Sequence, residues 1–329
     1  MNSFGRIFRV HIFGESHGPI VGVTLDGCPS GIALCAEDFV VDIDRRKPGA
    51  SGTTSRNEDD VPVIQSGIFN NYTTGAPLTI VFNNHNVISQ DYEISRKIPR
   101  PGHADFVASK KFRGFEDYRG SGHFSGRLTV GLVAAGVVAK KIISSFDSDD
   151  NIRIHSRLIA IAGESDLEKG IQKGIEANDS VGGIVECSIK GLPIGIGEPF
   201  FDSVESLISH AVFSIPAVRG IEFGSGFAAT KMFGSEHNDA LIDDQGHTQS
   251  NHSGGISGGL SNGNEILFRI AIKPTSSTPK EQQSLNIHKN VIESFQVKGR
   301  HDLCIALRVP VILEAVTAMV IADLLIKSK

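Results

Sequence analysis

Four histidines in short polar segments are the residues of this 329-residue chain best suited to proton transfer. They are His17 in GESHG, His103 in RPGHAD, His123 in GSGHFSG and His301 in GRHD. The neighbouring glycines and arginines indicate loops, where an imidazole can take up or release a proton near neutral pH. One loop histidine is usually an ordinary surface residue, and four in such similar settings weaken that interpretation without excluding it.

Arginine is concentrated in the first part of the chain. Ten of the 16 arginines precede residue 128, and most of them stand in loops beside glycine, proline or serine. The guanidinium group is planar, always charged, and binds phosphate and carboxylate groups through two parallel hydrogen bonds. A small-anion site is therefore one interpretation. The other is a set of solvated ion pairs with Asp38, Asp42, Asp59 and Glu116, and charge alone favours the ion pairs.

Two further segments are suited to binding phosphate or a flat ring. SNHSGGISGGLSNG, residues 250–263, exposes many backbone N–H groups beside little side-chain bulk. KPTSS, Lys273–Ser277, places one ammonium and three hydroxyl groups directly after an expected strand. For KPTSS alone, an ordinary polar loop is an equally good interpretation.

Other cofactor chemistries have weaker support. FGSGFAA contains Gly224-x-Gly226-x-x-Ala229, one form of the dinucleotide-binding fingerprint, but only a short strand-like segment precedes it and no clear amphipathic helix follows. An NAD(P)-dependent oxidoreductase is thus a second hypothesis. The chain has no G-x-x-x-x-G-K-[ST] motif, no H-E-x-x-H and no Cys/His pair at zinc spacing, so nucleotide-driven phosphoryl transfer and metal binding are disfavoured.

Composition limits the remaining classes. The net charge of −5 and the absence of tryptophan disfavour a third hypothesis, an RNA- or anion-binding module, and a membrane partner. The four cysteines form no C-x-x-C pair, and the N-terminus lacks the apolar stretch of a secretory signal, so we expect a cytoplasmic protein. Residues 309–326 are very apolar, but Glu314 and Asp323 interrupt them, which predicts a buried helix rather than a membrane span.

The expected elements give an α+β chain. Residues 128–143 form the clearest helix; they are apolar nearly all round and rich in Gly and Ala, so this helix should be buried with neighbouring backbone close to it. Mixed strands and central helices predict sheets covering buried helices in one domain, residues 1–329. The expected strands are residues 7–13, 20–25, 61–69, 78–82, 152–162, 182–189 and 265–272, with further helical spacing at residues 36–44 and 203–213.

Taken together and in order, the motifs resemble those of chorismate synthase over nearly the whole chain. They are FGESHG, DRRKPG, SGIF, TTGAP, SQDY, RPGHAD, DYRGSGHFSGRLT, SIPAVRGIEFGSGF, GSEHND, NHSGGISGGLSNG, KPTSS and GRHD, followed by Arg308 and Glu314. The resemblance implies a β-α-β sandwich with central helices between antiparallel sheets, assembled as a homotetramer. It also implies a lyase that converts 5-enolpyruvylshikimate 3-phosphate to chorismate and phosphate by anti-1,4 elimination, using reduced FMN.

The resemblance also implies roles for individual residues. His17 would protonate or stabilise the departing phosphate, His103 would act at the flavin N1–C2=O edge, and Asp302, helped by Ser16, would assist removal of the substrate proton. The substrate anions would be bound by Arg46, Arg56, Arg100, Arg127 and Arg308. The FMN contacts would be His123, Phe124, Ser125, Pro216, Ala217, Gly258, Lys273, Pro274, Thr275, Ser276, Ser277 and Arg300. We expect an external flavin reductase to supply reduced FMN.

The chain departs from the family pattern at two places. Many members have G-R-S-S-A-R-E-T where this chain has GHFSGRLT, which changes the residues at His123, Phe124 and Leu128. Many also carry an extra arginine where this chain has Gly52 and is one residue shorter. These departures put the flavin contacts of His123 and Phe124, and one anion contact, in question.

Overall fold

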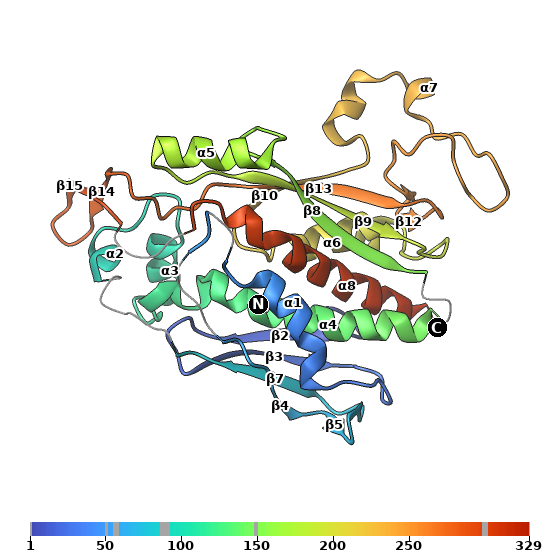
Figure 1. The fold of residues 1–329 in the computed structure, drawn as a ribbon, viewed down its shortest axis with the longest axis horizontal. Coiled ribbons are helices and arrows are strands. Elements are labelled where there is room, and N and C mark those ends of the chain that lie inside the picture. Colours follow the sequence, from blue (N-terminus) through green and yellow to red (C-terminus); the bar gives the residue numbers. More distant parts are fainter. Residues whose placement is uncertain are drawn as a thin grey trace.

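Two long apolar helices lie side by side between two antiparallel sheets (Figure 1). The computed structural model describes residues 2–49, 52–54, 59–85, 93–147, 151–297 and 302–328. The helices are α4 (Thr129–Phe146) and α8 (Val309–Lys327), and most residues of both are buried. A helix that is apolar on all sides needs cover on all sides, and the two sheets supply it.

The first sheet has five strands in the order β1-β2-β3-β7-β4 and covers one side of the helix pair. The turn between β2 and β3 carries Ser16 and His17, so the sheet fixes their position at one edge. The strands are β1 (Ser3–Phe4), β2 (Arg9–Gly14), β3 (Ile20–Asp26), β7 (Leu78–Asn83) and β4 (Val63–Ser66).

The second sheet has four strands in the order β10-β13-β9-β8 and covers the other side. Buried and less buried side chains alternate along β13, as expected for a strand with one face on the core. Helix α5 (Leu167–Ala177) lies beside this sheet, away from α4 and α8 (Figure 1). The strands are β10 (Val218–Phe223), β13 (Ile266–Ile272), β9 (Gly183–Lys190) and β8 (Arg153–Ile161).

The central helices approach each other closely at Gly136. A Cβ atom added there would overlap Ala315 of α8, so the glycine permits the backbone contact that the Gly/Ala-rich sequence predicted. Two described helical stretches, residues 126–146 and 305–327, are long and apolar enough to cross a membrane. In the fold, 78% and 89% of their apolar windows are buried against protein, which is the packing of core helices.

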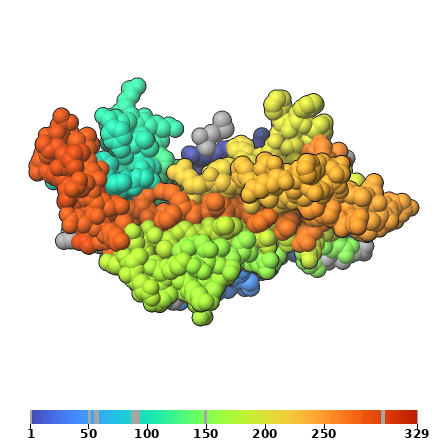
Figure 2. Space-filling view, turned by 90° about the horizontal axis from the view of Figure 1, so that it is seen from above, coloured from blue at the N-terminus to red at the C-terminus, as the bar shows by residue number. Residues whose placement is uncertain are grey.

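The shorter elements lie around this core, some at the ends of the sandwich and some against the central helices. The hairpin β14–β15 packs on residues 97–99, and α3 projects beside it (Figure 2). The α-helices are α1 (Val40–Arg46), α2 (Glu93–Lys97), α3 (Asp105–Phe112), α6 (Val204–Val212) and α7 (Gly234–His237). The strands are β5 (Ile68–Phe69), β6 (Tyr72–Thr73), β11 (Ile256–Ser257), β12 (Leu260–Ser261), β14 (Gln282–Asn286) and β15 (Val291–Phe295). Short 3-10 helices are η1 (Ala36–Phe39), η3 (Arg119–Phe124), η4 (Gly126–Leu128), η5 (Phe200–Asp202), η6 (Gly226–Lys231) and η7 (Ile305–Arg308).

The predicted arrangement of sheets over buried helices is confirmed. The expected strands and long helices occur with ends shifted by a few residues, with two exceptions. The expected strand at residues 61–69 is divided at Gly67 into β4 and β5, which belong to different sheets, and the expected helix at residues 36–44 begins as the 3-10 helix η1 before α1. The sequence interpretation missed α3, α5 and the hairpin β14–β15. Helix α3 and the hairpin have little regular apolar spacing, so their periodicity is weak. Helix α5 is amphipathic, with Leu167, Ile171 and Ile175 at every fourth position, so it could have been predicted from the sequence.

Candidate active site

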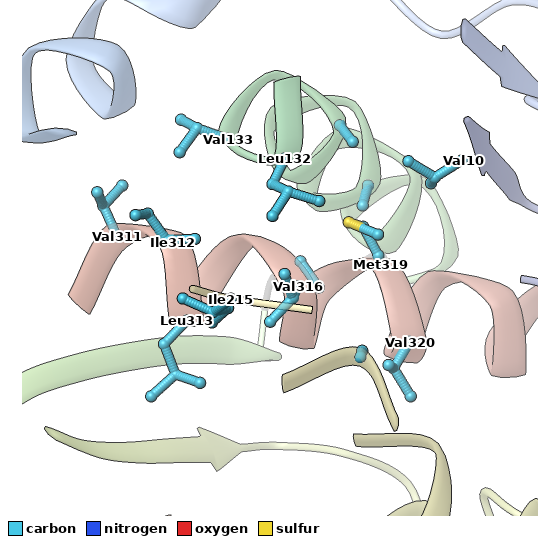
Figure 3. Packing of buried hydrophobic residues seen from close by; sticks show 14 of the residues in the cluster. Val10, Leu132, Val133, Ile215, Val311, Ile312, Leu313, Val316, Met319 and Val320 are labelled. Atoms are coloured by element: carbon cyan, nitrogen blue, oxygen red, sulfur yellow. The ribbon is translucent and has the colours of Figure 1, made fainter. Parts of the chain in front are cut away.

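A cavity of about 900 Å³ opens where α4 and α8 begin. Its floor is apolar and includes Leu132 of α4 and Met319 of α8, with Val10 of β2 beside them (Figure 3). Its other end is polar and charged, and the residues there come from four separate parts of the chain. They are Arg46, Thr54, Asp60, Arg100, His103, Ser121, Arg127, Lys273, Asp302 and Arg308.

The most buried part of the charged end is a carboxylate between two guanidinium groups. Asp60 accepts hydrogen bonds from Arg46 (Nη2 to Oδ2, 2.6 Å) and from Nη1 of Arg127. The side chain of Asp60 is 1% exposed, and those of the two arginines are 3% and 4% exposed. We call these three residues the cavity cluster. Burial opposes ionisation of Asp60, but the two arginines hold its pKa below the usual range.

Arg308 and Asp302 border the cavity cluster. Arg308 donates from Nε to the backbone oxygen of Arg46 (2.9 Å), and its Nη1 lies 3.3 Å from Oδ2 of Asp302. The other oxygen of Asp302 accepts the backbone N–H of Thr54 at 2.9 Å. Thus Asp302 is already oriented by the chain at the wall of the cavity.

The charged end carries more positive than negative charge. Arg46, Arg127 and Arg308 stand against Asp60 and Asp302, and the buried Nε of Arg46 has no hydrogen-bond partner among the described residues. Burial, together with repulsion by Arg308 and Arg127, lowers the pKa of Arg46 to about 10 despite Asp60. The N-termini of α4 and α8 add their positive dipole ends at the same place. Such a site is built to receive an anion.

Arg100, His103 and Asp105 form a second charged group at the cavity, which Arg100 and His103 line. Asp105 accepts from Arg100 at Nε and Nη2 (both 2.7 Å) and lies 2.6 Å from Nδ1 of His103. Arg100 also donates to Ser121 and Ser277, each at 2.9 Å. Burial opposes ionisation of Asp105, yet the hydrogen bonds from Arg100 and His103 hold its pKa well below the usual range. The carboxylate therefore fixes the orientation of the His103 ring.

Ser16 and His17 are buried directly behind the cavity wall. Gly120, which lines the cavity, adopts φ +58°, and a Cβ there would overlap the His17 ring and lie 2.8 Å from Oγ of Ser16. The backbone N–H of Ser16 donates to the oxygen of Gly122 at 3.1 Å. Neither Ser16 nor His17 itself lines the cavity, so Gly120 separates them from it in this conformation.

The KPTSS loop crosses the cavity wall just after β13. Lys273 donates from Nζ to the oxygen of Gly102 (2.7 Å) and to Oγ of Ser276 (2.9 Å). Burial, and to a lesser extent Arg219, lowers the pKa of Lys273. Five of the expected contacts line the cavity around this loop: Pro216, Ala217, Thr275, Ser276 and Ser277.

The segment GHFSGRLT, which differs from the family pattern, also contributes to the cavity wall. His123 lies 2.8 Å from the oxygen of Gly14 through Nδ1, while Phe124 is partly exposed and its ring is 6.2 Å from that of Phe112. Oγ of Ser125 accepts the backbone N–H of Arg127 and caps η4. Despite the departures, His123, Phe124 and Ser125 all line the cavity.

Besides Ser16 and His17, two expected site residues among those described do not line the cavity, and two more cannot be placed. Gly258 lies in the β11–β12 turn and Pro274 within the KPTSS loop, and neither lines it. Arg56 and Arg300 lie outside the described residues.

The dinucleotide fingerprint lacks its structural context. A Cβ at Gly226 would overlap the Glu222 side chain, and the segment continues into η6 (Gly226–Lys231), a 3-10 helix of six residues. A dinucleotide site needs a full α-helix whose N-terminus holds the pyrophosphate. The structure therefore removes the support for an NAD(P)-dependent oxidoreductase that uses this motif.

Sequence interpretation missed the residues that hold the arginines in place. Asp60, Asp105 and Asn84 bind arginine side chains at the cavity, whereas the partners considered from sequence were other acids. Of those acids, only Asp42 pairs with an arginine among the described side chains, at Arg45. Asp105 is the last residue of RPGHAD, two residues after His103, so its place in that motif was the signal that could have identified it.

Comparisons with known proteins agree with the motifs. Residues 8–326 match the family model described as chorismate synthase. A chorismate synthase of Chitinophaga pinensis is 64% identical, with 99% of this chain and 97% of the relative covered. One from Dehalococcoides mccartyi is 43% identical at the same coverage. A crystal structure of chorismate synthase matches the fold with a TM-score of 0.76 at 24% identity, covering 99% of this chain and 93% of that chain.

These matches extend over the whole chain, including both sheets, both central helices and every motif around the cavity. The predicted fold is therefore confirmed, and the elimination reaction and reduced FMN expected from the motifs are those of the matched family. By its sequence and its fold, this chain belongs to the chorismate synthase family.

Proposed function

We propose that this cavity binds 5-enolpyruvylshikimate 3-phosphate and converts it to chorismate and phosphate. The observation that carries the proposal is the excess positive charge of Arg46, Arg127 and Arg308 beside the N-termini of α4 and α8. A substrate with two carboxylates and a phosphate supplies the anions that this arrangement needs. Arg100 lines the same cavity.

The proposed proton transfers use residues at the charged end. Asp302, held by Thr54 and Arg308, would assist removal of the ring proton. The family resemblance implies that Ser16 helps it. His17, which lies behind Gly120, would stabilise the departing phosphate. His103, oriented by Asp105, would hold a proton at the edge of the flavin.

The cavity also fits FMN. About 900 Å³ and an apolar floor can accept a flat ring system, and Lys273 with the hydroxyls of Thr275, Ser276 and Ser277 can hold polar groups of the cofactor. Phe124, Pro216 and Ala217 would contact it from the same wall. When bound, reduced FMN supplies electron density while phosphate leaves, with no net redox change. The protein binds, orients and shields the reactants from water.

We also propose a homotetramer. Five phenylalanines, namely Phe115, Phe200, Phe201, Phe227 and Phe233, are between 76% and 91% exposed. Exposed aromatic side chains in this number favour contact with another protein surface. Light scattering should give about four times the chain mass of 35.2 kDa; a monomer at all concentrations would contradict the proposal.

We further propose that the chain is one domain, works in the cytoplasm and receives reduced FMN from a separate reductase. One hydrophobic core cluster joins residues of both sheets and both central helices, which supports the single domain. Steady NADPH oxidation by the pure protein with FMN would contradict the need for a separate reductase.

An anaerobic assay tests the reaction directly. Purified protein is mixed with 5-enolpyruvylshikimate 3-phosphate and chemically reduced FMN, and chorismate absorbance is followed together with released phosphate. We expect both products in equal amounts, and neither with oxidised FMN. No product from folded protein that still binds FMN would show that the fold is retained without the reaction.

A further inference from the structure

Asp60 is an unusual residue to find in a cavity that receives an anion. It lines the cavity, its side chain is 1% exposed, and a buried carboxylate there weakens the attraction of Arg46 and Arg127 for a substrate anion. Its backbone has φ +52°, a left-handed conformation that is uncommon for residues other than glycine. The fold therefore places Asp60 here at a cost to both backbone conformation and anion attraction.

The contacts of Asp60 indicate what offsets this cost. Each carboxylate oxygen binds a different arginine, Oδ2 to Arg46 at the end of α1 and Oδ1 to Arg127 in η4, just before α4. The two arginines come from separate elements, and Asp60 links their side chains directly. Without this link, the substrate would have to complete the ordering of both side chains, Arg46 most of all, at an entropic cost on binding.

Neighbouring contacts complete the orientation of both arginines. Asn84 accepts from Nε of Arg127 at 2.9 Å, and its amide donates to the oxygens of Glu15 and Gly18 in the turn that carries His17. Nη1 of Arg46 lies 3.4 Å from Oγ1 of Thr129. Asp60 is thus the shared partner of both guanidinium groups. That of Arg46 otherwise has only the 3.4 Å contact with Thr129 among the described residues, whereas Asn84 and the backbone oxygen of Asn83 also hold Arg127.

We propose that Asp60 is a positioning residue, which holds the guanidinium groups of Arg46 and Arg127 in the orientation that binds the substrate anions, a role that rests on the function proposed above. A residue that only reduced local positive charge would have the opposite effect, because removing it would strengthen the attraction for an anion. The sign of the change in substrate affinity therefore separates the two roles.

The experiment compares Asp60→Asn with Glu314→Gln as the matched control. Glu314 is also a buried carboxylate bound to an arginine of the same helix, Arg45, but it does not line the cavity. Both variants lose one buried charge without losing side-chain volume. Binding of 5-enolpyruvylshikimate 3-phosphate is measured by calorimetry with oxidised FMN, KM and kcat by the anaerobic assay, and Tm by thermal unfolding.

We expect Asp60→Asn to weaken substrate binding and raise KM about tenfold or more, with a smaller change in kcat, whereas Glu314→Gln leaves both within about twofold. An unchanged or lower KM and dissociation constant in Asp60→Asn, with a Tm loss like that of Glu314→Gln, would overturn the proposal. If the unaltered protein binds the substrate without converting it, the proposed reaction is wrong, but the binding comparison still tests Asp60. If the unaltered protein does not bind the substrate, both the proposed function and the proposed role of Asp60 are wrong.

Asn84→Ala keeps the test open if Asp60→Asn does not fold. Asn84 is only half-buried and holds Arg127 from the other side, so this variant should fold and raise KM about threefold in the same direction. If Asn84→Ala leaves substrate binding unchanged and no folded Asp60 variant binds more weakly, the proposal is wrong.

Discussion

Arg45 and Arg46 are adjacent in the sequence, yet they serve two different clusters. Arg45 binds both oxygens of Glu314, at 2.7 and 2.8 Å, in a pair that lies outside the cavity. Arg46 binds one oxygen of Asp60 and leaves its buried Nε without a partner among the described residues. Consecutive residues of a helix point in different directions, so one turn of α1 supplies a structural pair and a binding group.

The two clusters also differ in charge balance. The outer cluster consists of Arg45, Lys140, Asp42 and Glu314, in which two cations face two carboxylates. In and beside the cavity cluster, Arg46, Arg127 and Arg308 face two carboxylates, and two helix N-termini add to the positive side. Buried charges that are fully paired stabilise one conformation of the fold, whereas an excess of buried positive charge leaves a guanidinium group able to bind an anion.

Replacing a histidine should give the largest difference in kcat between the cavity and the outer cluster. His17→Ala should lower kcat about 10²- to 10⁴-fold, the range that a positioned proton donor contributes. His155→Ala is the control, because Nδ1 of His155 lies 3.8 Å from Glu314 in the outer cluster, and its kcat should be unchanged. Equal activity of the two variants in the anaerobic assay would contradict the role of His17.

Glycine replacement sharpens the comparison by separating activity from stability. In Gly120→Ala, the added methyl group meets His17 at a left-handed backbone position, so kcat/KM should fall about tenfold or more. In Gly136→Ala, the methyl group meets Ala315 at the helix crossing, so the free energy of unfolding should fall by about 1 to 3 kcal/mol while KM stays constant. Kinetics and urea unfolding on both variants check this. A changed KM in Gly136→Ala would contradict the prediction that this glycine affects stability alone.

Acid should reduce the stabilisation that each cluster contributes to the fold. The pKa of Asp60 and that of Glu314 are below their usual values in the folded state, because arginine contacts outweigh burial. Their stabilisation is fully present above the unfolded pKa of about 4 and is lost as pH falls through the folded pKa. Asp60→Asn and Glu314→Gln should each be less stable at pH 7, by about 1 to 3 kcal/mol, and lose less stability in acid. Urea unfolding from pH 6 to 2 measures this; an acid loss as steep as that of the unaltered protein would show that neither carboxylate contributes.

The smallest effect is expected at the edge of the outer cluster. Lys140 is 31% exposed and lies 2.7 Å from Asp42 and 3.4 Å from Glu314. Lys140→Gln should therefore reduce the free energy of unfolding by about 1 kcal/mol or less, without changing KM. A larger loss in thermal unfolding would mean that the outer cluster depends on Lys140 rather than on the Arg45–Glu314 pair.

The sequence predicted the core elements more completely than the exposed ones. Helices α4 and α8 are long and strongly apolar, so their burial followed from composition, and the close approach at Gly136 followed from small residues. The hairpin β14–β15 was missed because only Asn286 and Phe295 are buried within its strands, so no alternating pattern marks them.

At the cavity, residue types were predictable but their pairings were not. The motif resemblance identified Arg46, Arg127 and Arg308, and the structure brings all three to one end of the cavity. Asp60 was missed because it lies 14 residues from Arg46 and 67 from Arg127, and such contacts depend on the tertiary fold. The burial of His17 behind Gly120 likewise needs the turn after β2 and the 3-10 segment η3 to be placed together.

Calorimetry with 5-enolpyruvylshikimate 3-phosphate and oxidised FMN tests the central distinction between the two arginines most directly. We expect Arg45→Ala to bind the substrate within about threefold of the unaltered protein, at reduced stability. We expect Arg46→Ala to bind it about 100-fold more weakly, because a desolvated charge contact contributes about 2 to 5 kcal/mol. Equal affinities for the two variants would contradict the assignment of Arg46 to the substrate and of Arg45 to the fold.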